Sequence, residues 1–423
     1  MDDKFARLHR YNLWGNCTLE SGFWRGNYTD KLRAYCNNRL VKVVVGQRRS
    51  GKSYILRQVA LSLVHDGVSP NNIFIVNREL IDFDFLKTYQ DLDELFRWYI
   101  KEQNPIGRIY IFIDEVQLID GWEKFVNSYS QDYSRDYELF VSGSNSKMLS
   151  GELATLLSGR YVTMEVFPYS FNEYIGVTGK DFSRQAYIDY LGDSGLPEMF
   201  HLTNEEIKRN YIAALRNTVL LRDIINRHSI KDSYLLEDIF AYLVNNASNI
   251  VSISNIVNYM KSQGRKTSFD TIAAYIGYIC DTFILHKAER YDIKGKDVLN
   301  GNCKYYINDL AFSNYLYNGF AYGIGYKLEN LIYLDLCRAG YMVYVGAMRN
   351  REIDFVAIKG DRKIYVQVAY MLIDQETIQR EYSALEVVDD NFEKFVVSLD
   401  DIALPLREGI KHVPAWMFEN IIA

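Results

Sequence analysis

The chain contains a glycine-rich run, Gly46-Gln47-Arg48-Arg49-Ser50-Gly51-Lys52-Ser53, that admits few folds because it fits G-x-x-x-x-G-K-[ST] in full. It follows a β-branched run at 40–45, typical of a buried parallel strand, and it precedes the apolar spacing of a helix. Glycines let backbone N–H groups curl around phosphate oxygens, and the start of the helix adds a favourable dipole. The run therefore predicts a phosphate-binding loop, with Lys52 reaching the β- and γ-phosphates and Ser53 binding Mg²⁺.

The segments around this loop predict a parallel sheet. Apolar runs at 72–76, 108–113 and 137–143 are typical of buried strands, and helical spacing separates them. Strands that alternate with helices form a parallel sheet that is covered on both faces. We expect this α/β unit to extend to about residue 170.

Two acidic residues, Asp114 and Glu115, follow the strand predicted at 108–113. Ligands of α/β folds bind at the carboxyl edge of the sheet, where these carboxylates should lie. Asp114 is the candidate to hold Mg²⁺ through a water molecule, and Glu115 is the candidate to orient and polarise an attacking water. A small-molecule kinase needs no such second acid, and the sequence has no Asn-Lys-x-Asp motif to read guanine, which disfavours a GTPase.

Two later positions extend the predicted site. Ser142 or Asn145, at the end of the strand at 137–143, can contact the γ-phosphate, although a hydrogen-bonded turn would explain the same residues. Arg160 can supply positive charge to the transition state of a neighbouring subunit, and a surface salt bridge is the alternative. The predicted nucleotide contacts in and after the loop are Gly46, Arg48, Arg49, Ser50, Gly51, Lys52, Ser53 and Tyr54.

The remainder of the chain predicts three further domains. Helical spacing over 183–228 is interrupted by a turn at 194–197 and indicates a helical lid. Three helical stretches and two extended runs within 231–310 are typical of a winged helix-turn-helix. From about residue 322, a helix and three strand-like runs indicate a second α/β domain. The expected domains are a P-loop core at 1–170, a lid at 171–230, a winged helix at 231–320 and an α/β domain at 321–423.

The order of these elements, together with GQRRSGKS, IDEVQLIDGWEKF and LLSGRYVTMEVFPYSFNEY, resembles a prokaryotic family of AAA+-like and STAND-like ATPases. In that family the ATPase is fused to a C-terminal domain related to PD-(D/E)xK nucleases. The resemblance implies an ATP-binding core, a small lid, a winged helix and a C-terminal α/β domain of the restriction-nuclease type. We expect a homo-oligomer, in which Arg160 would complete a neighbour's site.

The resemblance also implies roles for residues of the lid. Gly195-Leu196-Pro197 resembles the lid motif of STAND-type ATPases, in which the proline lies near the base of the nucleotide, so that Pro197 is a predicted nucleotide contact. As bare sequence, the same three residues indicate only a turn. Arg216 or Arg222 is a candidate second sensor of the nucleotide, and the sequence does not choose between them.

The C-terminal domain departs from the pattern of an active PD-(D/E)xK nuclease. Such a site needs an acid on the first helix, an Asp on a strand and Glu-x-Lys on the next strand, where the strand carboxylates hold the metal. Glu329 and Asp354 match the first two places, but the third reads Gln367-Val368-Ala369. Glutamine lacks the charge that attracts Mg²⁺, and alanine cannot replace the lysine. We therefore expect a nuclease-like fold without nuclease activity.

The charge of the chain argues against a protein coated in basic residues for binding nucleic acid. The chain has 48 Lys and Arg residues and 54 Asp and Glu residues, which gives a net charge of −6. Residues 301–423 alone have 12 Lys and Arg residues and 17 Asp and Glu residues. Phosphate neutralisation supplies most non-specific affinity for DNA, so a duplex-binding domain should carry a basic surplus. The best local patch, Lys261, Arg265 and Lys266, precedes the predicted recognition helix at 268–283. It can contact double-stranded DNA, but winged helices also pack against proteins.

The cysteines and the apolar segments suggest the compartment. The five cysteines lie far apart and form no C-x-x-C pair, which is typical of reduced thiols in a cytosolic protein. The charged segment at residues 1–10 lacks the apolar stretch that a signal peptide needs, and the sequence contains no run of about 18 apolar residues. We expect a soluble, cytoplasmic protein.

Together these features predict a protein that binds ATP and Mg²⁺ and hydrolyses ATP. Its nucleotide state would be coupled to winged-helix and nuclease-like domains that bind DNA or a protein partner. One alternative is an ATP-dependent DNA nuclease with an altered active site. Another is a slow-turnover signalling scaffold that ATP assembles, which hydrolysis indifferent to DNA would favour.

Overall fold

The structure is a computed structural model that describes residues 7–15, 17–145, 155–317, 323–348 and 351–423. Its chain divides into two compact units, Met1–Val166 and Phe167–Ala423. The expected domain boundaries at 230 and 320 both fall inside the second unit. Each unit is therefore described by itself. Among the described residues, no helix is long and apolar enough to cross a membrane.

The first unit is built on a five-stranded sheet in the order β2-β3-β4-β1-β5. Every neighbouring pair of strands is parallel, as the alternation of strands and helices predicted. The apolar and β-branched runs predicted as strands form four of the five. The strands are β1 (Val41–Val45), β2 (Ile73–Asn77), β3 (Ile109–Asp114), β4 (Tyr137–Gly143) and β5 (Tyr161–Glu165).

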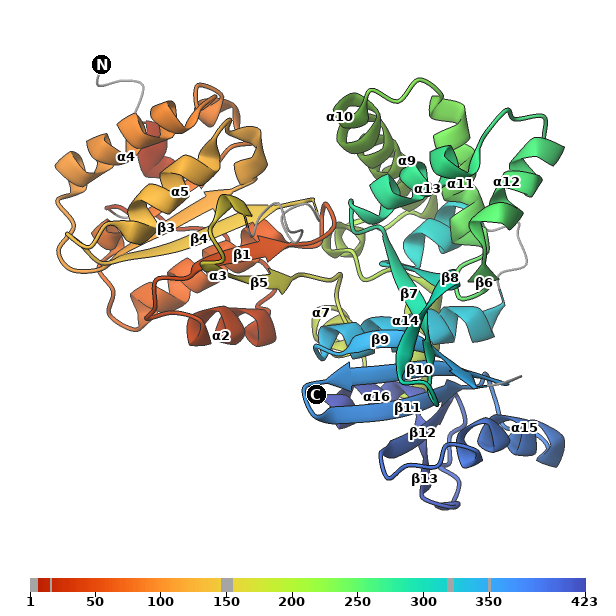
Figure 1. The fold of residues 1–423 in the computed structure, drawn as a ribbon. Coiled ribbons are helices and arrows are strands. Elements are labelled where there is room, and N and C mark those ends of the chain that lie inside the picture. Colours follow the sequence, from red (N-terminus) through yellow and green to blue (C-terminus); the bar gives the residue numbers. More distant parts are fainter. Residues whose placement is uncertain (1–6, 16, 146–154, 318–322, 349–350) are drawn as a thin grey trace. The chain divides into compact units, whose positions relative to one another are not determined.

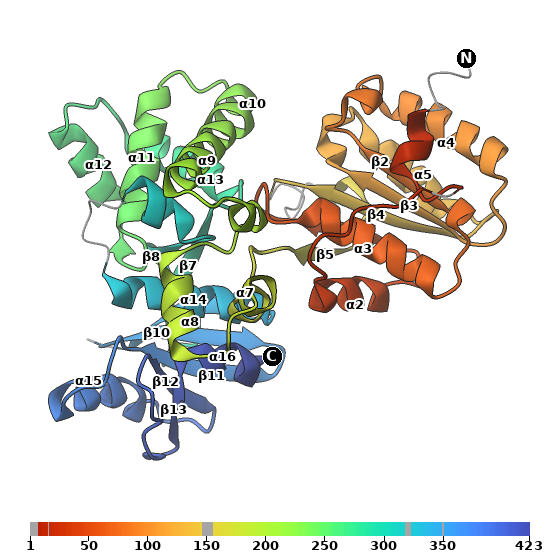
Figure 2. The same cartoon turned by 180° about the vertical axis from the view of Figure 1, so that it is seen from behind.

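Helices cover both faces of this sheet, with α2 and α3 on one side and α4 and α5 on the other (Figures 1 and 2). Side chains alternate along a strand, so Ile73 and Ile75 join the core beneath α3, while the Phe74 ring lies 5.2 Å from that of Phe96 in α4. The helices are α2 (Gly26–Ala34), α3 (Lys52–His65), α4 (Tyr89–Gln103) and α5 (Trp122–Gln131), with 3-10 turns η1 (Arg7–Tyr11), η2 (Pro70–Asn72), η3 (Ile81–Phe83) and η4 (Val116–Leu118).

The parallel register places the carboxyl ends of the central strands at one edge of the sheet. Asn77 at the end of β2 pairs with Asp114 at the end of β3, and Val45 of β1 pairs with Gly143 of β4. The chain then turns from β1 into the glycine-rich loop and α3. A Cβ atom at Gly46 would lie 2.3 Å from the backbone oxygen of Val166, so only glycine fits where this loop begins.

The second unit begins with helical segments, which contain the segment expected to form the lid. They share one apolar core that includes Tyr187, Leu215, Ile239 and Ile276. The helices and turns are α7 (Phe171–Thr178), α8 (Arg184–Gly192), η6 (Pro197–His201), α9 (Glu205–Thr218), η7 (Val219–Ile225), α10 (Asn226–His228), α11 (Ser233–Asn245), α12 (Ile253–Ser262), α13 (Phe269–Cys280) and η8 (Phe312–Leu316).

A mixed eight-stranded sheet runs through the second unit in the order β13-β12-β11-β10-β9-β7-β8-β6. It crosses the expected boundary at 320, because β7 pairs in parallel with β9, from Arg290 opposite Val345 to Asp292 opposite Ala347. The strands are β6 (Ile250–Val251), β7 (Leu285–Asp292), β8 (Asp297–Ile307), β9 (Met342–Met348), β10 (Arg351–Lys359), β11 (Arg362–Val368), β12 (Glu393–Ser398) and β13 (Ile410–Pro414).

The C-terminal part of this sheet carries helices on both faces, α14 (Ile324–Arg338) and α16 (Ala415–Ile422) on one and α15 (Gln375–Glu386) on the other. Phe355 and Ala357 of β10 join the core with α14, and Val356 between them joins the core with α15. The α/β character predicted for this part is therefore confirmed.

Candidate nucleotide site

The loop after β1 has the backbone of a phosphate cradle. Gly46, Arg49 and Gly51 have φ angles of 143°, 68° and 98°, values that turn the chain sharply back toward α3. The Lys52 ammonium is buried and donates to the backbone oxygens of Gly46 and Gln47, at 2.9 and 3.0 Å. A lysine held against loop carbonyls points along the loop, where a phosphate would lie.

Several side chains hold the loop in place. The buried Arg25 donates from Nη1 to the backbone oxygen of Ser50 at 2.9 Å. Arg48 pairs with Glu79 through Nη1 and Oε1, at 2.7 Å. Arg49 is exposed, and Tyr54 in the first turn of α3 is also exposed, at 40%. Sequence reasoning did not find Arg25, because it precedes the strand and no motif marks it.

The two acidic residues lie at the end of β3, where the sequence predicted them. The Asp114 carboxylate accepts hydrogen bonds from the Ser142 hydroxyl and from Asn77 Nδ2, the latter at 2.9 Å. Glu115 has a φ of 54°, and its backbone N–H donates to Ser142 Oγ at 3.1 Å. Ser142 therefore links both acids. Asn77 was missed by sequence reasoning, although it ends a strand as Asp114 does.

The Glu115 carboxylate and the Lys52 ammonium influence each other's titration. Burial raises the pKa of Glu115, and the positive charge of Lys52 opposes that rise. Burial lowers the pKa of Lys52, and the charges of Glu115 and Asp114 oppose that fall. The loop and the end of β3 thus form one electrostatic site.

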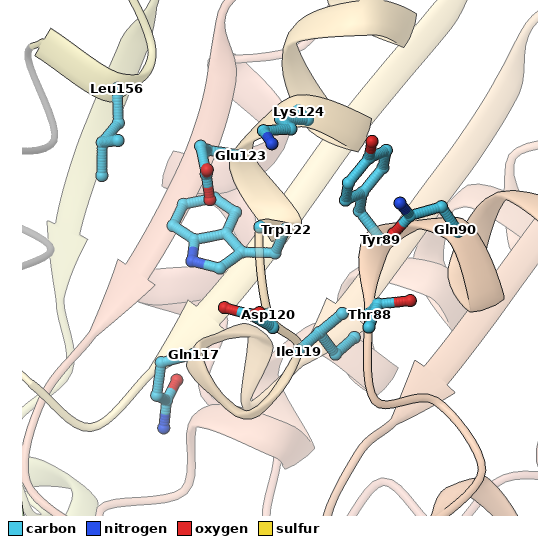
Figure 3. A pocket seen from close by; sticks show the side chains of 11 residues that line it. Thr88, Tyr89, Gln90, Gln117, Ile119, Asp120, Trp122, Glu123, Lys124 and Leu156 are labelled. Atoms are coloured by element: carbon cyan, nitrogen blue, oxygen red, sulfur yellow. The ribbon is translucent and has the colours of Figure 1, made fainter.

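The Glu115 carboxylate is also held by two donors. Oε2 accepts from Gln117 Nε2 at 2.5 Å and from Ser144 Oγ at 3.4 Å. Gln117 also lines a pocket of about 620 Å³. Figure 3 shows the side chains that line it. The other lining residues are Thr88, Tyr89, Gln90, Ile119, Asp120, Gly121, Trp122, Glu123, Lys124 and Leu156. Gln117 carried no signal beyond its place two residues after Glu115.

The later candidates lie at different places in the first unit. Ser142 lies on β4 against both acids, and Asn145 is buried two residues beyond the end of that strand. Arg160 is exposed immediately before β5, and its backbone oxygen accepts from Val41 N–H at 3.0 Å. Its role toward a neighbouring subunit remains a prediction.

The lid candidates belong to the second unit. The Gly195 N–H donates to Asp309 Oδ2 at 2.8 Å, and the backbone oxygen of Gly195 accepts from Tyr169 N–H at 2.7 Å. Pro197 begins the turn η6. Arg216 donates to its neighbour Asn217, and the Arg222 side chain lies outside the described part of the structure. Contact between these residues and a nucleotide remains a prediction.

The candidate DNA patch lies at the end of α12 and the turn after it. Lys261 and Lys266 are exposed. The Arg265 guanidinium pairs with Asp238, with Nε and Nη2 each 2.7 Å from Oδ2. This arginine already has an acidic partner, which leaves the two lysines as the exposed charges of the patch.

The three nuclease-like residues fall on the predicted elements and come together. Glu329 lies on α14, Asp354 on β10 and Gln367 on β11, and Asp354 N–H donates to Gln367 Oε1 at 3.3 Å. Glu329 and Asp354 are both buried. Within the described residues, no group of three or more His, Cys, Asp or Glu side chains is placed to hold a metal ion.

The loop in the first unit, by contrast, fits a Mg²⁺-bound phosphate. Its lysine is held in place, and the buried Ser50 hydroxyl has no hydrogen-bond partner among the described residues. Mg²⁺ in such sites takes one or two protein ligands together with substrate phosphates, so a single hydroxyl and a single carboxylate suffice. Ser53 in the first turn of α3 and Asp114 are the side chains that would hold it.

Comparison with protein families gives two matches. Residues 38–175 match the AAA domain, and residues 184–322 match a domain of unknown function, DUF8612. The first match covers the loop, both acids, Ser142, Asn145 and Arg160. The prediction of an AAA-like fold for this part of the chain is thereby confirmed over residues 38–175.

Two solved structures show a broader likeness. A Walker-type ATPase of Pyrococcus abyssi is 15% identical, with a TM-score of 0.48 over 70% of this chain and 96% of that chain. The Orc1 protein of Aeropyrum pernix, solved in complex with DNA, is 12% identical, with a TM-score of 0.33 over 70% of this chain and 92% of that chain. Likeness at this level is too coarse to support a conclusion about function.

Two curated relatives extend over both units. An uncharacterized protein of Methanocaldococcus jannaschii is 28% identical over 416 residues, covering 89% of this chain and 87% of its own length. An uncharacterized protein of Haemophilus influenzae is 34% identical over 403 residues, covering 93% of this chain and 98% of its own length. Because the likeness to the Haemophilus influenzae protein spans nearly all of both chains, this chain belongs to the same family as that protein.

Proposed function

We propose that this protein hydrolyses ATP with Mg²⁺ in its first unit. The observation that carries the proposal is that one unit holds both a lysine bound to the carbonyls of the loop and a buried carboxylate, Glu115, directly after β3. A nucleotide-binding scaffold needs the lysine but does not need an acid able to activate water. The choice of ATP over GTP follows from the family and from the missing guanine motif.

Each polar side chain has a defined task in this proposal. The loop N–H groups and Lys52 bind the phosphates, and Ser53 and Asp114 hold Mg²⁺, which would neutralise charge on the phosphate oxygens. Glu115 orients the attacking water and accepts its proton. Gln117 and Ser144 hold the Glu115 carboxylate in position by donating hydrogen bonds to it. Asn145 contacts the γ-phosphate.

We also propose that exchange or hydrolysis of the nucleotide in the first unit moves elements of the second unit. The element order α11-β6-α12-α13-β7-β8 supports a winged helix, and α14 followed by β9, β10, β11 and α15 supports a nuclease-like domain. Ordering or releasing contacts with the nucleotide is a common way to move such elements. The partner of this unit is double-stranded DNA or a protein, with Lys261 and Lys266 as phosphate contacts in the first case.

Steady-state hydrolysis of ATP tests the proposal, measured on the wild type and on Glu115→Gln, each with and without Mg²⁺ and double-stranded DNA. We expect hydrolysis that requires Mg²⁺ and is lost in Glu115→Gln. A rate that rises with DNA would identify DNA as the partner, and a rate indifferent to DNA would favour a protein. Hydrolysis by Glu115→Gln at the wild-type rate would refute the role of Glu115.

The oligomeric state has its own test. If Arg160 completes a neighbour's site, light scattering should give a mass above that of one chain, and Arg160→Ala should lose hydrolysis while keeping that mass. Mixing Arg160→Ala with Glu115→Gln should then restore part of the activity, because one kind of site in the mixed oligomer is complete. No recovery in a mixture shown to exchange subunits would count against the proposed role of Arg160.

A further inference from the structure

A buried lysine lies among the carboxylates of the C-terminal sheet. Lys304 of β8 places its Nζ 2.9 Å from Glu329 Oε1, 2.8 Å from Glu352 Oε1 and 3.5 Å from Asp354 Oδ1. Its side chain is only 5% exposed. The ammonium therefore occupies the centre of a carboxylate group drawn from α14 and β10, which is the position that a cation would take.

Further donors of the protein also contact this centre. Glu329 Oε1 accepts a second hydrogen bond, from Tyr306 OH at 2.7 Å, and Asp354 Oδ2 accepts from Val368 N–H at 2.9 Å. Gln367 Nε2 donates to Glu381 Oε2 at 2.9 Å. A metal ion would have to displace these donors before it could bind the same oxygens.

The lysine offsets part of the negative charge of this centre, where three carboxylates surround one ammonium. Glu329, Glu352 and Asp354 lie within 3.5 Å of the Lys304 ammonium, and nearby negative charges favour the charged form of a lysine. A divalent cation beside this ammonium would meet strong like-charge repulsion in a poorly hydrated interior.

We infer that Lys304 takes the place of a metal ion in this centre, so that the nuclease-like part holds β8, α14 and β10 together by an internal ion cluster and binds no divalent cation there. The inference rests on the proposed nuclease-like fold for the position of the metal, and it does not depend on ATP hydrolysis. It also goes beyond the loss of the Glu-x-Lys pair, since a cation supplied by another strand now fills the site. This centre would therefore not cut nucleic acid by a metal-dependent reaction.

Manganese binding tests the first half of the inference. Free Mn²⁺ is measured by electron paramagnetic resonance during titration of the nucleotide-free full chain, comparing wild type with Asp354→Asn. We expect the same binding curve for both, because any weak binding arises at the loop and Asp114. A manganese ion that the wild type binds and that Asp354→Asn loses would overturn the inference.

Thermal unfolding tests the second half. Removing one partner of a buried ion cluster leaves the others uncompensated, so Lys304→Met should lower the unfolding midpoint by about 10 °C. Lys287→Met is the matched control, because Lys287 lies on the neighbouring strand β7 and pairs with Glu289 where both side chains are 46% exposed. Surface pairs contribute little, so this variant should shift the midpoint by no more than about 3 °C.

A double variant keeps the test decisive if Lys304→Met alone does not fold. Lys304→Met with Glu329→Gln removes one charge of each sign, and we expect it to recover at least half of the lost midpoint. A double variant no more stable than Lys304→Met, or a Lys304→Met midpoint equal to that of Lys287→Met, would overturn the ion cluster. Because none of these measurements involves ATP, their failure would leave the proposed hydrolysis intact.

Discussion

Substituting Gly195 by alanine should destabilise the second unit and leave nucleotide binding unchanged. The new Cβ would lie 2.5 Å from the backbone oxygen of Tyr169 and 3.1 Å from its nitrogen. Restoring ordinary contact, which begins at 3.4 Å, requires the two segments to separate. That movement would break the 2.7 Å hydrogen bond from Tyr169 N–H to the Gly195 oxygen.

The magnitude follows from these two effects. Overpacking of a tight site costs about 2 kcal/mol, and loss of the hydrogen bond adds about 1 kcal/mol. A loss of about 3 kcal/mol lowers the midpoint of a domain of this size by about 9 °C. Scanning calorimetry on the full chain measures the shift, and the Michaelis constant for ATP measured in parallel should stay within about twofold.

Gly192→Ala is the control, because this glycine is exposed and no atom lies within 4 Å of an added Cβ. It should leave the midpoint where it is in the wild type. The reasoning would be refuted by a Gly195→Ala protein with a wild-type midpoint and a raised Michaelis constant. That pair of results would instead support the nucleotide contact implied by the resemblance of Gly195-Leu196-Pro197 to a lid motif.

Two other predictions follow from buried side chains. Arg25→Met removes the charged donor that holds the Ser50 carbonyl, so this variant should bind ATP about tenfold more weakly with little change in kcat. Titration with a fluorescent nucleotide measures the affinity, and an unchanged affinity would contradict the prediction. Burial lowers the pKa of His286 to about 4, whereas the pKa of a histidine in the unfolded chain is about 6.5. The folded protein is therefore fully stable above pH 6.5 and loses stability as the pH falls from 6.5 toward 4, because only the unfolded chain takes up a proton there. Wild type should lose about 1–2 kcal/mol more than His286→Gln between pH 8 and pH 5 in urea unfolding, and identical losses would count against it.

The sheet of the first unit could be predicted because its signals are local. Apolar β-branched runs form strands, such as β1 with Val43, Val44 and Val45, and each is followed by a helix. The place of Asp114 and Glu115 at the end of β3 follows from that pattern alone. Parallel strands then bring their carboxyl ends to one edge of the sheet without further information.

The features that the sequence did not reveal depend on long-range pairing. β7 pairs with β9 and so joins two segments expected as separate domains, but a strand's pattern does not state which strand it pairs with. Lys304 meets Glu329 and Asp354 only because of this sheet, from 25 and 50 residues away. In the printed sequence it is one lysine before two tyrosines. The Glu-x-Lys pattern directed attention to Ala369, whereas the cation comes from another strand.

The hydrogen-bond donors around Glu115 could not be predicted from the sequence either, although they lie close to it in the chain. Gln117 reaches back to the carboxylate because Glu115 has a positive φ and the chain turns immediately into η4. The sequence predicted an acid pair after the strand, and that interpretation assigns no task to Gln117. Side-chain contacts within a turn depend on backbone angles that residue types alone do not fix.

The central claim is that the loop binds ATP and that Glu115 then activates water. Equilibrium binding of ATP with Mg²⁺ and single-turnover hydrolysis, measured side by side on wild type, Lys52→Ala and Glu115→Gln, test it most directly. We predict that Lys52→Ala loses both binding and hydrolysis, while Glu115→Gln binds ATP as the wild type does and hydrolyses it at least about 100-fold more slowly. Tight ATP binding by Lys52→Ala, or turnover by Glu115→Gln at the wild-type rate, would contradict the claim.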